Sequence, residues 1–111
     1  NTADSGGAIY HAANRLYITD SLFEGNMAID GNGGALTSFG TVTTIERTTF
    51  YDNEASMSGG GLYISSSSSV DYQSTIINST ISNNQAGLNG GGISFVGGTH
   101  FCCGICRPVF G

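Results

Sequence analysis

A histidine and three cysteines near the end of the chain are the residues best suited to binding a metal. The set is His100, Cys102, Cys103 and Cys106, all within seven residues. Imidazole and thiolate groups are the usual ligands of zinc. However, two of the cysteines are adjacent, the spacing is not that of paired Cys-x-x-Cys motifs, and three is an odd number for a disulfide framework. We therefore predict no metal site and no cofactor in this segment.

Carboxylates are the second group of residues that could carry chemistry. Glu46, Asp52 and Glu54 lie near one another in the sequence, and Asp20 and Glu24 precede them by about one period of the repeat described below. Acidic clusters of this kind serve glycoside hydrolases, and polysaccharide lyases use them with arginine. Here the acids do not recur at one position of the repeat. We therefore predict a solvated acidic surface and no catalytic residue in this stretch.

Two shorter motifs and the histidines add no further site. Asp30-Gly31-Asn32-Gly33 is similar to a calcium loop, but it offers a single carboxylate. Asn78-Ser79-Thr80 is an N-glycosylation sequon, although one match is expected by chance in a chain so rich in these residue types. No Ser/His/Asp set can be assembled around His11 or His100. We predict neither a calcium site nor a nucleophilic triad.

The composition limits the classes of protein to which the chain can belong. Glycine, serine, threonine and asparagine supply 52 of the 111 residues, and charged residues make up 10%, against about 25% in an ordinary domain. A net charge of −5 argues against a nucleic-acid partner. No apolar run reaches the roughly 18 residues of a membrane-spanning helix, and no signal peptide is recognisable. Because the first residue is Asn1, we expect a piece of a longer or processed protein.

An internal repeat of about 27 residues dominates the sequence. One motif appears as Gly6-Gly7-Ala8-Ile9, Gly33-Gly34-Ala35-Leu36, Gly60-Gly61-Leu62 and Gly91-Gly92-Ile93. A second appears as Phe23-Glu24-Gly25-Asn26, Phe50-Tyr51-Asp52-Asn53 and Ile81-Ser82-Asn83-Asn84, and Ile18, Ile45 and Ile76 keep the same spacing. Paired glycines, β-branched residues and asparagines at this period are typical of the coils of a parallel β-helix. We predict an all-β fold, a right-handed single-stranded parallel β-helix solenoid with about three complete coils and a partial fourth.

The repeat also assigns boundaries along the chain. We place the β-helix at residues 1–98, with coils near residues 6–32, 33–59 and 60–90 and the start of the next coil at residue 91. The third coil is longer, and we interpret its serine run, residues 65–69, as a surface loop. Residues 99–111 form an atypical Cys-containing tail. This tail is either foreign to the repeat, from a shifted reading frame or a truncated gene, or an element that caps or links the end of the solenoid.

Alternation along each strand predicts which side chains face the core. The inward columns are Ile9/Leu36/Leu62/Ile93, Ile18/Ile45/Ile76 and Phe23/Phe50/Ile81, and the outward columns are Tyr10/Thr37/Tyr63/Ser94 and Tyr17/Thr44/Thr75. Because Asp20 and Arg47 occupy equivalent positions in adjacent coils, we expect them to form an ion pair.

The recurring turn residues have structural roles of their own. We expect Asn26, Asn53 and Asn84 to adopt the left-handed conformation that asparagine tolerates and to bond to one another as a ladder of stacked amides. The paired glycines are expected where φ is positive or where neighbouring coils approach too closely for a Cβ atom. These structural turn glycines are Gly6, Gly7, Gly33, Gly34, Gly60, Gly61, Gly91 and Gly92.

The two motifs resemble the GGA[ILV] and FxxN repeats of the chlamydial polymorphic outer membrane protein family. GGAI and GGAL represent the first motif, FEGN and FYDN the second, and the resemblance covers about residues 6–96. Membership of the family would imply a secreted or surface-exposed right-handed β-helix, often an autotransporter passenger carried to the outer membrane by a C-terminal barrel.

We interpret the chain as a fragment of a secreted or cell-surface β-helix scaffold, adhesin-like or passenger-like, and not as an enzyme in this stretch. Two alternatives stay open: part of a polysaccharide-active β-helix lyase or hydrolase, and a structural spacer. Expected partners are a host-surface or carbohydrate ligand, with no nucleic acid and no membrane-spanning segment in this fragment. We also expect self-association through the open ends of the solenoid, because unpaired strand edges template further pairing.

Overall fold

The computed structural model describes residues 1–12, 14–39, 42–66, 73–97, 100–103 and 106–107. Within these residues the chain forms short strands joined by turns and no helix, and the strands assemble into four parallel sheets of four strands each. This confirms the predicted all-β solenoid. Strands of this length cannot bury an apolar face alone, so stability depends on stacking one coil on the next.

The four sheets are numbered in the order in which one coil visits them. Sheet 1 contains β2 (Ile9–His11), β6 (Leu36–Ser38), β10 (Leu62–Ser66) and β14 (Ile93–Gly97). Sheet 2 contains β3 (Arg15–Thr19), β7 (Val42–Glu46), β11 (Gln73–Ile77) and β15 (His100–Cys103). Sheet 3 contains β4 (Leu22–Glu24), β8 (Thr49–Tyr51), β12 (Ser79–Ser82) and β16 (Cys106–Arg107). Sheet 4 contains β1 (Thr2–Ala3), β5 (Met27–Ala28), β9 (Glu54–Ala55) and β13 (Gln85–Ala86).

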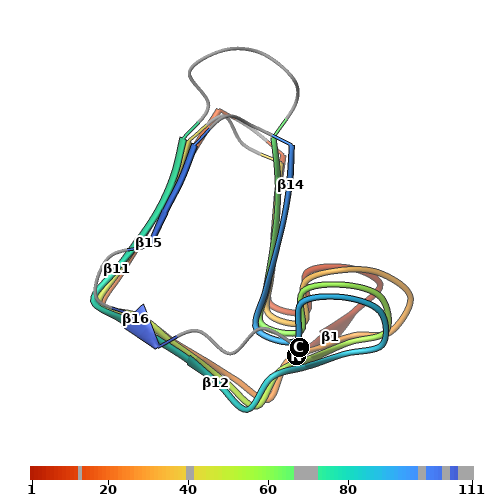
Figure 1. Cartoon of the computed structure of the whole chain (residues 1–111). Helices are drawn as coiled ribbons and strands as arrows, with labels where there is room; N and C mark the ends of the chain where they lie inside the picture. Colours follow the sequence, from red (N-terminus) through yellow and green to blue (C-terminus); the bar gives the residue numbers. More distant parts are fainter. Residues whose placement is uncertain (13, 40–41, 67–72, 98–99, 104–105, 108–111) are drawn as a thin grey trace.

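Figure 1 shows the solenoid along its axis, so that successive coils overlie one another. Sheets 1, 2 and 3 form the three long sides of a ring, and sheet 4 with the loops that follow it forms a smaller lobe at one corner. Every strand pairs in parallel with its equivalent one coil away, as in the alignment of Ile18 with Ile45 and of Ile45 with Ile76. The sequence period is therefore the length of one coil.

The core fills the ring with the predicted columns of apolar side chains. Leu36, Ile45 and Phe50 are fully buried, and the rings of Phe23 and Phe50 stack with centroids 4.8 Å apart and planes inclined by 6°. Ile9 and Phe23, in the first coil, pack against this cluster while staying partly exposed. Burial of each large side chain contributes about 1.5 to 3 kcal/mol, so the central coils hold most of the apolar stabilisation.

One predicted outward position is covered instead of exposed. Thr37 points away from the core between Tyr10 and Tyr63, yet it is only 1% exposed. Its hydroxyl donates a hydrogen bond to the carbonyl oxygen of Asn32, 2.7 Å away, in the loop that enters the same coil. Thr37 thus keeps the predicted outward position, but its burial was not foreseen, because alternation along a strand gives no information about a loop that packs over the outer face.

The longer third coil and the tail lie partly outside the described residues. Ser65 and Ser66 belong to β10, where they pair with Val96 and Gly97, so the first two serines of the run are in a strand and not in a loop. Residues 67–72 lie outside the described part, so the loop expected there stays a prediction. The described backbone of the tail, residues 100–103 and 106–107, pairs with β11 and β12, which adds strands to sheets 2 and 3.

Candidate functional site

The asparagines predicted to form a ladder lie one above another at the turn between sheets 3 and 4. The side-chain amide of Asn26 donates to Asn53 Oδ1 at 2.9 Å, and that of Asn53 donates to Asn84 Oδ1 at 2.9 Å. The same two oxygens also accept the main-chain N–H groups of Asn26 and Asn53, at 2.9 and 2.8 Å. Each carbonyl oxygen therefore accepts two donors from the preceding coil.

The asparagine amides also bond to the sheet 3 strand of the preceding coil. Asn53 Nδ2 donates to the carbonyl oxygen of Phe23, and Asn84 Nδ2 donates to that of Phe50, both at 3.0 Å. All three ladder residues are buried. Because buried polar groups are costly unless they are hydrogen-bonded, this position accepts few other residue types, which explains the recurrence of asparagine.

The conformation expected for the ladder asparagines was wrong by one residue. Positive φ values occur at Gly25, Asp52 and Asn83, which precede the ladder residues, and not at the ladder residues themselves. Glycine, aspartate and asparagine all tolerate the left-handed region. The tight bend is therefore made by the third residue of the FxxN motif, and the fourth is left free to turn its amide along the axis.

Sequence reasoning missed a fourth member of this ladder. Asn1 occupies the same position one coil before Asn26: its main-chain nitrogen donates to Asn26 Oδ1 at 3.0 Å, and its carbonyl oxygen accepts the N–H of Met27 at 2.8 Å. The interval of 25 residues hid it, because the motif lacks its first three letters there.

A second ladder, made of hydroxyl groups, was also missed. Thr48 Oγ1 donates to the carbonyl oxygen of Glu46 and accepts the N–H of Ser21 from the preceding coil, and Ser79 Oγ does the same for Ile77 and Thr48. The signal was available in the sequence, since Ser21, Thr48 and Ser79 form a column of hydroxyl residues. These hydroxyl groups bond to main-chain N–H and C=O groups at the turn between sheets 2 and 3, where the hydrogen bonds between strands are interrupted.

The turn glycines divide into two structural classes. Gly6 and Gly33 have positive φ, as do Gly59 and Gly90 in the next two coils, which the set drawn from the sequence missed. Gly60 needs space instead: a Cβ atom there would overlap the carbonyl oxygens of Gln85 and Gly91. Gly7, Gly34, Gly61, Gly91 and Gly92 are all buried as well. The paired glycines allow successive coils to pack closely where the loops that follow sheet 4 lead into sheet 1.

The structure brings two of the candidate carboxylates together around one arginine. Arg47 donates to both carboxylate oxygens of Asp20, from Nε at 2.7 Å and from Nη2 at 3.0 Å, and its Nη1 donates to Glu46. The predicted Asp20–Arg47 ion pair is therefore present, and it joins adjacent coils. The hydrogen bond from Arg47 lowers the pKa of Asp20, and the same bonds raise the pKa of Arg47.

We expect the pKa of Asp20 to rise toward the ordinary aspartate value of about 3.9 when Arg47 is replaced by alanine. The hydrogen bond favours the charged carboxylate, so the stabilisation by the pair is present above the unfolded-state pKa and is lost as the pH falls through the lower folded-state value. An NMR titration of the Asp20 carboxyl measures this shift, with Arg15→Ala as the control substitution. An unchanged titration in Arg47→Ala would show that the pair does not form in solution.

The other candidate carboxylates do not join this cluster. Asp52 accepts a hydrogen bond from Asn83 Nδ2, 3.2 Å away at the equivalent turn of the next coil. Glu24 and Glu54 are exposed on sheets 3 and 4. Among the residues that the structure describes, no three histidine, cysteine, aspartate or glutamate side chains are grouped as a metal site would need.

The weaker motifs occupy exposed turns, and the cysteines form part of two edge strands. Asp30 and Asn78 are both exposed. The register aligns Cys102 with Thr75 and Cys103 with Ile76 in sheet 2. The described structure does not extend to the side chains of the tail, so the absence of a metal site there stays a prediction.

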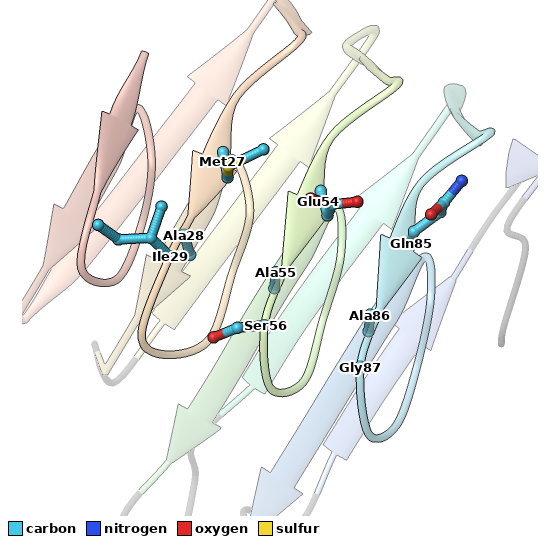
Figure 2. Close-up of a pocket in the computed structure, with 9 residues that line it drawn as sticks. All are labelled: Met27, Ala28, Ile29, Glu54, Ala55, Ser56, Gln85, Ala86 and Gly87. Atoms are coloured by element: carbon cyan, nitrogen blue, oxygen red, sulfur yellow. The ribbon is translucent and has the colours of Figure 1, made fainter.

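A groove of about 340 Å³ runs across three coils along sheet 4. Figure 2 shows that equivalent residues of β5, β9 and β13 and of the positions that follow line up along it. They are Met27, Ala28, Ile29, Glu54, Ala55, Ser56, Gln85, Ala86 and Gly87. Its lining offers one carboxylate, that of Glu54.

A row of aromatic side chains lies on the outer side of sheet 1. The ring centroid of Phe39 is 5.6 Å from that of Tyr10 and 6.2 Å from that of Tyr63. Tyr10 and Phe39 are 59% and 42% exposed. Exposed aromatic groups of this kind are typical of interaction surfaces, and this row was not foreseen because Phe39 falls outside the repeated motifs.

The comparison with protein families decides which repeat this is. The model of the Chlamydia polymorphic membrane protein repeat matches residues 47–65 and 78–96. The chain carries the Chlamydia polymorphic membrane protein repeat. Each matched segment runs from the turn before sheet 3, through the asparagine ladder and the lobe, into sheet 1 of the next coil, so the resemblance inferred from the motifs is confirmed.

Chlamydia polymorphic membrane protein repeats indicate a surface-associated β-helix protein. No curated protein and no solved structure matches the chain. Within the described residues, no helix is long and apolar enough to cross a membrane. The repeat thus identifies the type of coil, and the further role of the chain is argued from its own geometry.

Proposed function

We propose that the chain is a segment of a rigid β-helix scaffold at the cell surface, passenger-like and adhesin-like, that presents its outer faces to a host-surface or carbohydrate partner. The observation that carries this proposal is the asparagine ladder within the matched repeats. A ladder that fixes each coil on the next holds outer side chains at constant spacing along the axis. Such a surface suits recognition of an extended partner.

The hydrogen bonding of the polar residues supports a role as scaffold. Asp20 and Glu46 are bonded to Arg47, and Asp52 is bonded to Asn83. Each of these contacts joins neighbouring residues or coils, and the two carboxylates that converge, Asp20 and Glu46, are neutralised by the Arg47 guanidinium between them. In a scaffold the hydrogen-bonded polar residues are expected at the turns, whereas an enzyme gathers its reactive groups in a cleft.

A polysaccharide-active enzyme is the second candidate, and the groove on sheet 4 is the observation in its favour. Hydrolysis of a glycosidic bond ordinarily requires a pair of carboxylates on either side of the bond. Glu54 is the acid in the lining of this groove. A groove with one carboxylate can bind a polysaccharide chain without cleaving it. We therefore prefer a binding role for the groove to a catalytic one.

Protease shaving of intact cells that produce the protein tests the proposed location. We expect external proteinase K to remove the signal of an antibody against the chain, while a cytoplasmic marker in the same cells is unaffected. The signal should also be removed when fixed but unpermeabilised cells are treated. Protection of the chain until the cells are lysed would refute a surface location.

A further inference from the structure

The aromatic side chains of sheet 1 form a continuous row across three coils. Tyr10 and Tyr63 occupy the same position of the repeat two coils apart, with Thr37 between them. Two strand spacings amount to about 10 Å, whereas aromatic rings interact at centroid distances of about 4.5 to 7 Å. The ring centroid of Phe39 lies 5.6 Å from that of Tyr10 and 6.2 Å from that of Tyr63. Phe39 thus supplies the ring that the middle coil lacks at the position of Thr37.

The row is open to solvent on the outside of the solenoid. Tyr10 and Phe39 are 59% and 42% exposed, and Tyr63 is partly exposed. Aromatic residues that a partner covers often contribute most of the free energy of binding. Because the outer face runs parallel to the axis, coils added before or after these three would lengthen this face and would not cover it.

The outer face of sheet 1 differs from the other faces in its lack of charge. Among the described residues, its outward positions carry only aromatic, aliphatic and hydroxyl side chains. Besides the row they are Ala12, Thr37, Ser65, Ser94 and Val96. Exposed charged side chains lie instead on sheets 2, 3 and 4, at Arg15, Glu24 and Glu54. The face therefore matches a ligand that is itself uncharged.

An uncharged oligosaccharide has the chemistry that this face would recognise. One side of a sugar ring presents C–H groups that pack on an aromatic ring, and its edge presents hydroxyl groups that bond to those of tyrosine and serine. An anionic glycan would find no cation on this face, and the net charge of −5 would repel it. A basic peptide would find no carboxylate here with which to pair.

We propose that the row of Tyr10, Phe39 and Tyr63 is a binding site for an uncharged oligosaccharide, with sugar rings packed on the aromatic rings along the solenoid axis. This assigns a site and a class of ligand to the carbohydrate partner of the proposed scaffold, and it rests on that proposed function. Phe39 is in contact with both neighbouring rings. Binding therefore depends most on Phe39.

Substitutions of Phe39 test the site. Phe39→Ala removes the central ring, Phe39→Tyr keeps it, and Phe39→Leu keeps an apolar side chain without an aromatic face. Tyr17→Ala is the matched control, because Tyr17 is 69% exposed on sheet 2 and lies outside the row. Tyr10→Ala is a second variant in the row, at its most exposed ring. Circular dichroism checks that each variant keeps its strand content.

Binding is measured first on an array of uncharged, sulfated and sialylated oligosaccharides. The full chain is applied as a tetramer on streptavidin, so that multivalency makes weak contacts detectable. The uncharged oligosaccharide with the strongest signal is then titrated into each variant by isothermal titration calorimetry. Phosphatidylcholine vesicles are the probe for a membrane surface, since aromatic residues are also enriched at membrane interfaces.

We expect the unmodified chain to bind uncharged oligosaccharides in preference to anionic ones. Phe39→Ala, Phe39→Leu and Tyr10→Ala should each weaken binding by about tenfold or more, whereas Phe39→Tyr and Tyr17→Ala should leave the dissociation constant nearly unchanged. A preference for anionic glycans, binding to vesicles alone, or no binding to any glycan would overturn the proposal. An equal loss in Tyr17→Ala, or none in Phe39→Leu, would do the same.

The outcome of this experiment is separate from that of the protease shaving test. The binding assays use the purified chain, so they do not depend on where the protein is located. A surface-exposed chain that binds no uncharged glycan would overturn the site and leave the scaffold in place. A chain protected from external protease would instead refute the surface location, whatever the arrays show.

Discussion

Replacing Phe50 with alanine is expected to lower the free energy of unfolding by about 3 to 5 kcal/mol. Phe50 is fully buried in the central coil, its ring stacks on Phe23, and its strand is aligned with Ile81 on the other side. Truncation removes the transfer free energy of the ring and leaves a cavity between two coils that the backbone ladders hold at a fixed distance. The core cannot collapse along the axis without breaking these ladders.

The matched control for this experiment is Tyr51→Ala, the next residue in the same strand. Tyr51 points outward and is 40% exposed, so its loss should change stability by about 0.5 kcal/mol or less. Urea denaturation at low protein concentration compares the two variants with the unmodified chain. Equal losses would mean that the assignment of inward and outward faces is incorrect.

Replacing Asn53 with alanine is expected to lower the free energy of unfolding by about 2 to 6 kcal/mol. Asn53 is 1% exposed, and its side chain bonds to Asn26, Asn84 and the carbonyl oxygen of Phe23. Alanine would remove the partner of the main-chain N–H and of the side-chain amide of Asn26 and that of the C=O of Phe23, and the two main-chain groups alone cost about 1 to 3 kcal/mol each. Circular dichroism during urea unfolding measures the loss.

Asn83→Ala provides the control for the ladder substitution, because Asn83 is exposed and makes one side-chain bond, to Asp52. It removes the same functional group one coil away. We expect its effect to be about 1 to 2 kcal/mol, which is the cost of placing alanine at a residue with positive φ. If Asn53→Ala were no more destabilising than Asn83→Ala, the ladder would contribute nothing to the stability of the coils.

The period of the sequence was enough to predict the fold, because each coil packs against its neighbours through residues at equivalent positions and these positions must therefore carry similar residue types. Stacked strands place equivalent residues about 4.8 Å apart, so a change of residue type in the column of Ile18, Ile45 and Ile76 would disturb two neighbours at once. This requirement appears in the sequence as a regular interval. The asparagine ladder could be predicted for the same reason.

Features that depend on loops or on single coils could not be read from the period. The burial of Thr37 results from a loop that folds over sheet 1, and the row of Tyr10, Phe39 and Tyr63 combines a repeated position with one that is not repeated. The left-handed residue of the FxxN turn was misplaced because asparagine favours that conformation at the fourth position as much as at the third. Only the backbone distinguishes the two.

The measurement that tests the stacked-coil account most directly is the set of NMR nuclear Overhauser contacts between isoleucine methyl groups. The structure aligns Ile45 with Ile18 and with Ile76, 27 and 31 residues away, and buries all three. Selective methyl labelling should therefore give contacts from Ile45 to both residues. Contacts from Ile45 to neither of them, or to Ile77 in place of Ile76, would contradict the register on which the ladder and the core depend.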